Sequence, residues 1–504
     1  MQPLGKSIRV EPGAGLQDAL FELGVEFPCG GRGRCKGCRV RLVSGHAPVN
    51  EHDVARLSPA ELADGWRLAC GIRPDSDITL DLAQWETSVL SDNSQFHFEP
   101  RPGLGVAIDL GTTTIVAQLL DLQTGSVLGV QAALNAQARH GADVMSRIEF
   151  ALRDQGQHVL EALVRDQIGT MLNQLLDISP AAVGASCDRV VLVGNTVMHH
   201  LFSGQDVEPL SHYPFEPGST GLQRFRSNDL GWTVPGNPEV YFLPCLGGFV
   251  GSDILAGILA TRLHERDSLA VLIDLGTNGE IVVGNREGLV CAATAAGPAF
   301  EGACISMGMR AATGAISEVR VLSHTLECRV LGGTTARGIC GSGLVDAVAA
   351  GLELGAVLPN GRLANGKPLE LQPPVKLNQA DIRELQLAKG AIAAGIRLLL
   401  EDRGASVGEV TQVFLAGAFG NYISQENARR IGLFEFPPAV MLAAGNTALL
   451  GAKLALFQAD PEKLCYPAIR ERTRHLSLNE RPGFEEVYAE AMGFPESGHK
   501  LRSL

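Results

Sequence analysis

The sequence predicts two different folds in one chain of 504 residues: a small α+β domain at the N-terminus and a larger α/β region that repeats its own design. Short alternating segments around a cluster of cysteines indicate the first. An apolar strand that ends in Asp-Leu-Gly-Thr, present at Asp109 and again at Asp274, indicates the second. A polar, proline-bearing stretch separates them. We therefore expect domains at 1–84 and 104–504, joined by a linker at 85–103.

The composition restricts the class of protein. With 45% hydrophobic residues and 59 glycines, the chain can form large cores and many tight turns. A net charge of −13 argues against nucleic acid as a partner. The longest apolar stretch, 439–457, contains Asn446 and Lys453, so no membrane span is expected. The N-terminus lacks the apolar segment of a secretory signal, so we expect a cytoplasmic protein whose cysteines are ligands or buried thiols.

The segments of the N-terminal domain alternate in a way typical of a small sheet. Residues 7–11, 38–45 and 77–82 are predicted as strands, and residues 15–24 as a short amphipathic helix. Together they predict a mixed sheet that clasps one helix.

Four cysteines of this domain have the spacing of metal ligands. Cys29, Cys35 and Cys38 form a C-x5-C-x2-C pattern in a glycine-rich loop, and Cys70 follows after 31 intervening residues. A [2Fe-2S] cluster requires four thiolates, and glycines let the backbone curl around its sulfides. The alternatives are a structural zinc site and reduced thiols without metal. Zinc sites usually pair two C-x2-C motifs, and only one is present here.

The stretch 1–84 resembles the plant-type ferredoxin domain, a β-grasp fold, with one extra residue between the first two cysteines. The resemblance implies that the four cysteines named above hold a [2Fe-2S] cluster. The other seven show no ligand-like spacing, and we expect nearly all of them to pack in cores. They are Cys187, Cys245, Cys291, Cys304, Cys328, Cys340 and Cys465. The linker would let such an electron-carrying domain move, or it is a static surface strap.

Two strand-turn-strand segments carry residue types that bind phosphate and magnesium. The first contains, in order, Asp109, Gly111, Thr112 and Thr113. The second contains Asp274, Gly276, Thr277 and Asn278. An aspartate at a strand end can hold hydrated Mg2+, while N–H groups and hydroxyls of the turn face phosphate oxygens. The repetition predicts two similar lobes that present these turns to one nucleotide in a shared cleft.

This duplicated α/β design resembles the superfamily of actin, Hsp70 and sugar kinases, of which the two turns would be the phosphate motifs. Residues 413–424 resemble its adenosine motif, with a strand followed by a turn through Gly417 and Gly420. Residues 338–355 begin a helix, whose first N–H groups can receive another phosphate. The helix start contains Gly341, Ser342 and Gly343. For each motif the alternative is a tight turn without a ligand, and no Walker A signature is present.

Three polar features near these motifs have open interpretations. His199 and His200 are adjacent, so on a helix they point about 100° apart and cannot readily share a metal. Packing or surface hydrogen bonding is expected for them. Asn195 is expected where a strand end meets the cleft. Glu280 is a candidate for positioning water, and an outward-facing strand residue is the alternative.

The stretches CGGRGRCKGC, DLGTTT, VGNTVMHH, DLGTNGE, GICGSGLVDA and LAGAFGNYI, in that order, resemble the reductive activators of corrinoid enzymes over nearly the whole chain. Members of that family use ATP to return a Co(II) corrinoid to Co(I). The resemblance implies a [2Fe-2S] cluster, ATP and Mg2+ as cofactors. It implies a corrinoid-binding methyltransferase protein and an upstream electron donor as partners, and a homodimer as the assembly.

The resemblance also implies roles for the site residues. Asp109 and Asp274 would organise Mg2+ and the attacking water. Thr112, Thr113, Thr277 and Asn278 would hold phosphates, and Gly417 and Gly420 would bound the adenosine pocket. A plant-type cluster has a potential of about −400 mV. Since about 59 mV changes a one-electron equilibrium tenfold, an acceptor several hundred millivolts lower would need ATP to become reduced.

Three other functions are compatible with parts of the sequence. An ATP-dependent activator of another radical enzyme, of the 2-hydroxyacyl-CoA dehydratase type, resembles only the ATP half and shares one [4Fe-4S] cluster between two subunits. A small-molecule kinase with a redox-sensing domain would turn over ATP without a protein acceptor. An Hsp70-like binding module would need a peptide-binding domain after residue 460, where the sequence is too short.

Overall fold

The computed structural model describes residues 7–21, 23, 25, 27, 31, 33, 36, 38–82, 96–178, 186–276, 278–302, 304–458 and 466–496. The predicted ligands Cys29 and Cys35, the predicted phosphate contact Thr277, and Cys465 lie outside these residues. Within the described ranges, no helix combines the length and the apolar character needed to cross a membrane.

The N-terminal domain is built on a three-stranded antiparallel sheet. Its central strand β1 (Arg39–Ser44) pairs with β2 (Trp66–Leu68) and β3 (Thr79–Asp81). Its helices are α1 (Gln17–Phe21), α2 (Glu51–Arg56), α3 (Pro59–Ala63) and the short η1 (Ala69–Gly71). Leu20, Val40, Leu68 and Leu80 are fully buried in one small core. The predicted helix and two of the predicted strands are confirmed in shortened form.

The strand predicted at 7–11 is wrong, because the described residues there have no regular structure. Ile8 is 38% exposed. Val10 is partly buried against the core of the domain, so one apolar contact is made without a strand.

Lobe 1 of the large region is a six-stranded sheet with the order β6-β5-β4-β7-β9-β8. The strands are β4 (Leu104–Leu110), β5 (Thr114–Asp121), β6 (Val127–Leu134), β7 (Cys187–Gly194), β8 (Gln223–Arg226) and β9 (Glu239–Phe242). One face packs on α4 (Val144–Ala151), α5 (Gly156–Ile178) and α6 (Thr196–Ser203). Consecutive residues of β4, such as Val106 and Ala107, pack into different cores, because successive side chains of a strand point to opposite faces of the sheet.

Lobe 2 repeats five strands of this topology in the order β19-β18-β10-β11-β12-β20, and its sixth strand, β20, lies at the opposite edge from β8 of lobe 1. The strands are β10 (Ala270–Leu275), β11 (Gly279–Asn285), β12 (Gly288–Thr294), β18 (Gln412–Ala416), β19 (Met441–Gly445) and β20 (Thr473–His475). In both lobes, three antiparallel strands lead into two parallel ones. The outer face packs on α8 (Gly341–Glu353) and α9 (Gln379–Asp402). The predicted duplicated α/β fold is confirmed.

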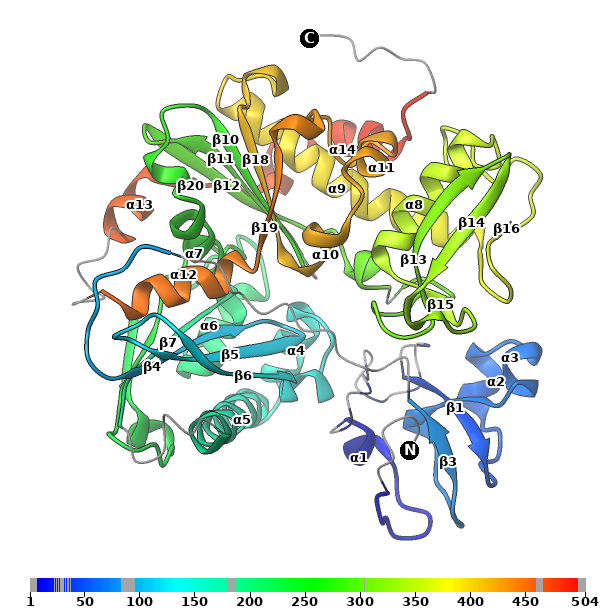
Figure 1. The fold of residues 1–504 in the computed structure, drawn as a ribbon, viewed down its shortest axis with the longest axis horizontal. Coiled ribbons are helices and arrows are strands. Elements are labelled where there is room, and N and C mark those ends of the chain that lie inside the picture. The colour runs from blue at the N-terminus through cyan, green and yellow to red at the C-terminus, as the bar shows by residue number, and fades with distance from the viewer. Residues whose placement is uncertain are drawn as a thin grey trace.

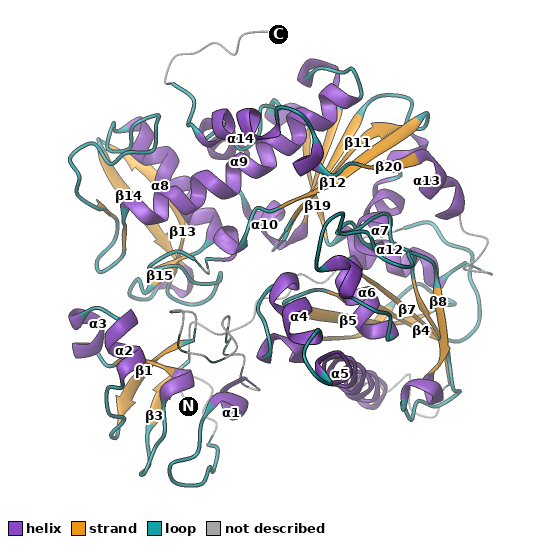
Figure 2. Cartoon of the chain, turned by 180° about the vertical axis from the view of Figure 1, so that it is seen from behind, coloured by secondary structure: helices purple, strands orange, loops and turns teal. Residues whose placement is uncertain are grey.

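Two helices, α7 (Ser252–Thr261) and α12 (Thr447–Leu456), lie between the two sheets (Figure 1) and form one core with their inner faces. Seen from behind (Figure 2), α9 and α14 (Phe484–Met492) lie together on the outer side of lobe 2, and α5 lies on the outer side of lobe 1.

The remaining described elements surround this frame. The strands are β13 (Ala315–Leu322), β14 (Thr325–Val330), β15 (Gly338–Ile339), β16 (Leu369–Glu370) and β17 (Lys376–Leu377). The helices are α10 (Gly417–Tyr422), α11 (Gln425–Arg430) and α13 (Tyr466–Arg472). The 3-10 turns are η3 (Ala136–Arg139), η4 (Glu208–Leu210), η5 (Ser227–Leu230), η6 (Leu263–Glu265), η7 (Pro298–Glu301), η8 (Leu331–Gly333), η9 (Val407–Glu409), η10 (Pro438–Val440) and η12 (Leu478–Glu480). The N-terminal domain lies beside the sheet β13–β15 and beside lobe 1 (Figure 1).

Candidate nucleotide and cluster sites

A cavity of about 340 Å³ lies between the lobes, at the ends of the strands. Its volume is in the range of small-molecule sites. Ten of the predicted site residues line it: Asp109, Gly111, Thr112, Thr113, Asp274, Gly276, Asn278, Gly341, Ser342 and Gly417. These residues come from four separated segments of the chain, and folding places them on one surface.

Hydrogen bonds from Asn135 and Arg147 to its carbonyl groups hold the turn of lobe 1 in place. The Nδ2 of Asn135 donates to the carbonyl of Gly111 at 2.9 Å, and the N–H of Asn135 donates to that of Thr113 at 2.8 Å. Arg147, which is fully buried, donates Nη2 to the carbonyl of Thr112. Burial lowers the pKa of Arg147 to about 9. Thr112 and Thr113 line the cavity, whereas Asn135 and Arg147 are not among its lining residues.

The turn of lobe 2 brings a second carboxylate to the cavity. In the pairing of β10 with β11, Glu280 stands directly opposite Asp274, so both side chains are on the same face of the sheet. Glu280 is only 7% exposed and lines the cavity. The candidate role in positioning water is therefore compatible with its place, whereas an outward-facing position is not.

Five carboxyl groups line this cavity: Asp109, Asp253, Asp274, Glu280 and Glu301. Burial raises the pKa of Asp109 to about 6, although a hydrogen bond of 2.9 Å from Asn446 Nδ2 opposes the rise. Burial and repulsion from Asp109 raise the pKa of Asp274 to about 7. Burial and repulsion from Asp274 raise the pKa of Asp253 to about 8. Burial and the neighbouring aspartates raise the pKa of Glu280 well above its usual value.

This group of carboxylates fits a hydrated Mg2+. Within the described residues, no three His, Cys, Asp or Glu side chains converge closely enough to hold a metal by themselves. Mg2+ prefers one or two carboxylates together with water and phosphate oxygens, rather than a complete protein cage. A divalent cation would also relieve the repulsion that raises the pKa values of Asp109 and Asp274.

Asp253 and Asn446 are site residues that the sequence analysis missed. Asp253 is in the first turn of α7, where acidic residues are common because they favour the helix dipole. Asn446 caps α12 by accepting from the N–H of Leu449 at 2.8 Å. Both residues have an ordinary role at the start of a helix. They become site residues only because the fold brings these helix starts to the cavity beside Asp109 of β4.

The predicted adenosine motif is a strand followed by the short helix α10 rather than by an open turn. Gly417 has a φ of +81°, and a Cβ there would lie 2.7 Å from the carbonyl oxygen of Leu275 and 2.8 Å from Asp274 Oδ1. The rings of Phe300 and Phe419 stack with centroids 4.5 Å apart at this end of the cavity. They provide the flat apolar surface that a purine base requires.

Two predicted glycines lie behind the cavity wall instead of on it. Gly420 is buried against Leu415, and Gly343 approaches the carbonyl of Ile316 more closely than any side chain would allow. Both glycines allow close packing of the segments that carry Gly417 and Ser342. Their contact is with the protein rather than with the cavity.

The described half of the predicted cluster site fits thiolate ligation. The N–H of Ala69 donates to the carbonyl of Cys38 at 2.9 Å, which places Cys70 next to Cys38. Cys38 is 1% and Cys70 is 6% exposed. In the loop between the first two predicted ligands, Gly31 and Gly33 have φ values of +75° and +67°, which other residues rarely adopt. Soft sulfur donors in an apolar core suit an iron-sulfur cluster.

The other polar and cysteine predictions mostly concern packing. His199 and His200 are fully buried and contact different backbone carbonyls, those of Gly221 and Thr196. Asn195 caps α6 and donates Nδ2 to Thr112 Oγ1 at 2.8 Å, so it meets the cleft as expected. Four cysteines, Cys187, Cys245, Cys291 and Cys340, are buried. Cys340 also lines the cavity, and Cys304 is exposed, which core packing did not predict.

Comparison with known families accounts for three consecutive parts of the chain. Residues 1–75 match the 2Fe-2S iron-sulfur cluster binding domain, residues 104–266 the RACo middle region, and residues 268–503 the C-terminal domain of RACo, the ASKHA domain. The corrinoid activation enzyme RamQ of Eubacterium limosum is 34% identical over 437 residues, which cover 79% of this chain and 72% of that protein. The chain belongs to the reductive activators of corrinoid proteins.

Two further members of this family resemble the chain over most of its length. The [Co(II) methylated amine-specific corrinoid protein] reductase of Methanosarcina barkeri is 28% identical over 431 residues, covering 79% of this chain and 78% of that protein. The solved structure of a reductive activator for corrinoid, iron-sulfur protein has a TM-score of 0.69 and 27% identity, covering 100% of this chain and 99% of that one. A 2Fe-2S domain and an ATP-binding ASKHA domain are thus parts of this activator. Membership of this family favours the function of a reductive activator of corrinoid proteins over the dehydratase-type activator, the kinase and the Hsp70-like module.

Proposed function

We propose that this activator uses ATP to pass one electron from its [2Fe-2S] domain to a corrinoid protein, which reduces Co(II) to Co(I). The observation that carries the proposal is the meeting of both phosphate turns and five carboxyl groups in one cavity, in a chain that also carries a 2Fe-2S domain. The substrate class follows the family, in which the named relatives act on corrinoid proteins.

In the proposed site, the two lobes divide the work on ATP. Thr112 and Asn278 hold phosphate oxygens from opposite sides, and Ser342 extends the contact at the N-terminus of α8. Asp109 and Asp274 would hold the water shell of Mg2+, and the metal would supply positive charge for the phosphates. Glu280 and Asp253 would orient the attacking water, and Glu280 would accept its proton once a bound Mg2+ has lowered the pKa of this carboxyl group, which burial and repulsion raise. Phe300 and Phe419 pack against the base.

At the proposed electron site, Cys38 and Cys70 hold the cluster together with Cys29 and Cys35. When bound there, the cluster would supply the one-electron redox chemistry for reduction of the cobalt. The apolar core around Cys38 and Cys70 keeps water away from the sulfur ligands and so helps to set the potential. Hydrolysis of ATP to ADP and phosphate supplies the free energy that the electron transfer lacks.

The test uses the full-length protein, purified without oxygen, and a corrinoid methyltransferase protein in the Co(II) state. With a strong reductant and ATP, we expect the Co(I) absorption to appear, and we expect the [2Fe-2S] spectrum to be lost in Cys70→Ser. Omission of ATP and replacement by a non-hydrolysable analogue are the controls. Equal reduction without ATP would contradict the ATP-driven mechanism, and an unchanged spectrum in Cys70→Ser would contradict the cluster assignment.

The finer features of the proposal follow from the family resemblance and from the composition. They are the homodimer, the upstream electron donor, the cytoplasmic location and the domain limits 1–84 and 104–504 with the linker 85–103. Light scattering of the purified protein checks the dimer. Limited proteolysis followed by mass spectrometry checks the domain limits, since linkers are the preferred sites of cleavage.

A further inference from the structure

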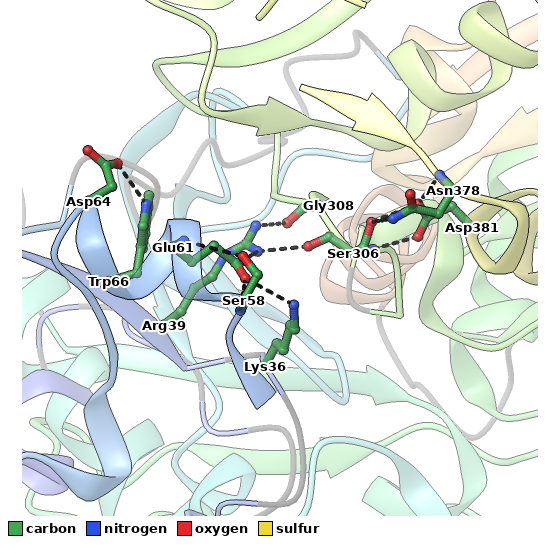
Figure 3. A network of polar contacts seen from close by, with 10 residues as sticks. All are labelled: Lys36, Arg39, Ser58, Glu61, Asp64, Trp66, Ser306, Gly308, Asn378 and Asp381. Carbon is green, nitrogen blue, oxygen red and sulfur yellow. Dashed lines mark hydrogen bonds and ion pairs between the residues drawn. The ribbon is translucent and has the colours of Figure 1, made fainter. Parts of the chain in front are cut away.

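The ferredoxin domain contacts both lobes of the ATPase, and each contact is made by a segment that also supports the nucleotide cavity. On lobe 2 the contacts involve Arg39 and Asp81 (Figure 3 shows the Arg39 part). On lobe 1 they involve α1. A small domain can keep its contacts with both lobes only while the distance between the lobes stays the same.

Arg39 is the central contact with lobe 2. Its Nη1 donates to the carbonyl of Ser306 at 2.8 Å, and its Nη2 donates to that of Gly308 at 3.1 Å. Within its own domain, Arg39 packs over the ring of Trp66 and lies 3.7 Å from Glu61. Its side chain is 13% exposed, so the guanidinium is held in place on both sides.

The receiving loop is fixed to lobe 2. Asp381, at the start of α9, accepts from the N–H of Ser306 at 2.6 Å and from Ser306 Oγ at 2.7 Å (Figure 3). Asn378 Nδ2 also donates to Ser306 Oγ at 3.1 Å. A movement of this loop is therefore transmitted to the long helix behind the β11–β12 hairpin.

The same loop continues directly into the cavity. Gly308 forms a bridge to Ile339 of β15, and the next residues, Met309 and Arg310, line the cavity. Beyond β15, Cys340 and Ser342 line it as well. The residue just before β15 is Arg337, whose Nη1 lies 2.9 Å from Oδ2 of Asp81 in the ferredoxin domain. Both polar contacts with lobe 2 are thus within three residues of the cavity wall.

On lobe 1 the contact is apolar at its centre. Leu134 and Ala138 belong to the core of the ferredoxin domain, and Arg139 lies 4.8 Å from the ring of Phe21 and 3.4 Å from Asp18. This segment also contains Asn135, which ties the carbonyls of the phosphate turn. The apolar contact is costly to break, whereas the polar contacts with lobe 2 can exchange with water.

Charge indicates how a nucleotide would act on this bridge. The described residues that line the cavity include five acidic side chains and a single cation, Arg310. Phosphates that bind to the turn of lobe 1 would attract Arg310 and the N-terminus of α8 from lobe 2. The lobes would then approach, and the loop that Arg39 holds would shift with Arg310.

We propose that Arg39 and Arg337 form a latch between the ferredoxin domain and lobe 2, and that nucleotide binding in the cleft opens this latch while the domain stays on lobe 1. The inference rests on the proposed ATP-binding function and adds how the site controls the electron carrier. Because coupling between sites is reciprocal, a latch that nucleotide opens must itself weaken nucleotide binding by the same factor.

The test measures this reciprocity in the full-length protein with its cluster. Arg39→Gln and Arg337→Gln each remove one half of the latch, from opposite sides of the contact. Arg41→Gln is the matched control, because Arg41 is in the same strand and pairs only 2.7 Å away with Asp64 of its own domain. We expect both latch variants to bind a non-hydrolysable ATP analogue about 5- to 10-fold more tightly in calorimetry, and the control to bind as the wild type does.

Small-angle X-ray scattering supplies the second measurement. The analogue should change the radius of gyration of the wild type and of Arg41→Gln by more than it changes that of the latch variants, in which the ferredoxin domain is already released from lobe 2. Arg39 follows a cluster ligand, so its variant is compared at equal [2Fe-2S] absorption. If that absorption is lost, Arg337→Gln carries the test alone.

The outcomes separate the two proposals. Unchanged affinity in the latch variants, or a radius that does not respond to the analogue, would overturn the latch and leave the proposed ATP-driven activity standing. A wild type that binds no nucleotide would overturn the proposed function, and the latch with it. Weaker binding of the analogue in the latch variants would mean that nucleotide strengthens the latch, and this would contradict the proposal that nucleotide opens it.

Discussion

The two phosphate hairpins have nearly the same sequence, but the structure gives them different surroundings. In lobe 1 the pairs Leu110–Ile115 and Asp109–Val116 leave a four-residue turn. In lobe 2 the pairs Leu275–Gly279 and Asp274–Glu280 leave a three-residue turn. The residue opposite the aspartate is therefore a valine in one lobe and a glutamate in the other.

The support behind the hairpins differs as well. The turn of lobe 1 is tied by Asn135 and the buried cation Arg147. The turn of lobe 2 faces Asp253 and carries Glu280. A cradle with a cation behind it suits phosphates, and a group of carboxylates suits a metal and water. The comparison teaches that two copies of one hairpin can both face a shared cavity while only one of them places a second carboxyl group opposite its aspartate.

The largest effect on ATP hydrolysis is expected at the aspartate that both hairpins share. Asp109→Asn and Asp274→Asn each remove a charge from the proposed Mg2+ position, so we expect ATP hydrolysis to fall on the order of 10²- to 10³-fold in each. Phosphate release measures the rate, and an unchanged [2Fe-2S] spectrum is the control for folding. A large loss in one variant and none in the other would break the equivalence of the hairpins.

The position opposite the aspartate should separate the copies. Glu280→Gln keeps the shape but cannot accept a proton, so we expect kcat for ATP hydrolysis to fall about 10²-fold with nucleotide affinity nearly unchanged. Val116→Ala, at the matching place in lobe 1, should change kcat by no more than about threefold. A comparable loss of kcat in both would mean that the difference between the turns has no catalytic meaning.

The support of the lobe 1 turn should affect binding more than turnover. Arg147→Met removes the donor to the Thr112 carbonyl and the cation behind it, and we expect the Kd for ATP to rise about tenfold. Arg147→Lys keeps the charge and should restore part of the affinity, which a purely structural role would not predict. Arg153→Gln, which loses an exposed pair with Glu149, is the control. Equal affinity in all three would remove the distinction between the supports.

The smallest effect concerns the helices after the parallel strands. In lobe 1, burial lowers the pKa of His199 on α6 to about 3, whereas α10 of lobe 2 contains no histidine. An unfolded histidine titrates at about 6.5. The stability from a neutral His199 is therefore present above about pH 6.5 and is lost as the pH falls toward 3, by about 1.4 kcal/mol per unit.

His199→Phe should reduce this acid sensitivity. The difference in the free energy of unfolding between pH 7.5 and 5.5, measured in urea by tryptophan fluorescence, should be about 1 kcal/mol smaller in the variant. His158→Gln, on the exposed side of α5, is the control. An unchanged pH dependence in His199→Phe would mean that His199 does not carry the acid sensitivity of lobe 1.

Much of the site could be predicted because its central parts are local. A strand, its terminal aspartate and the turn that follows are consecutive in the chain, so Asp109 and Asp274 are visible without a fold. Asp253 and Asn446 were missed because their local patterns are those of ordinary helix starts. Gly343 and Gly420 were placed on the cavity because a glycine needed for close packing has the same appearance in a sequence as one needed for a ligand.

The sequence by itself determined the two folds, the order of the motifs and the four cysteines, because these depend on local periodicity and spacing. Only the tertiary structure decided that Glu280 faces Asp274, that Arg147 is behind Thr112, and that Arg39 contacts a loop 267 residues away. Such contacts join residues that are distant in the chain. Their energy comes from geometry and desolvation that exist only after the two lobes and the ferredoxin domain have packed together.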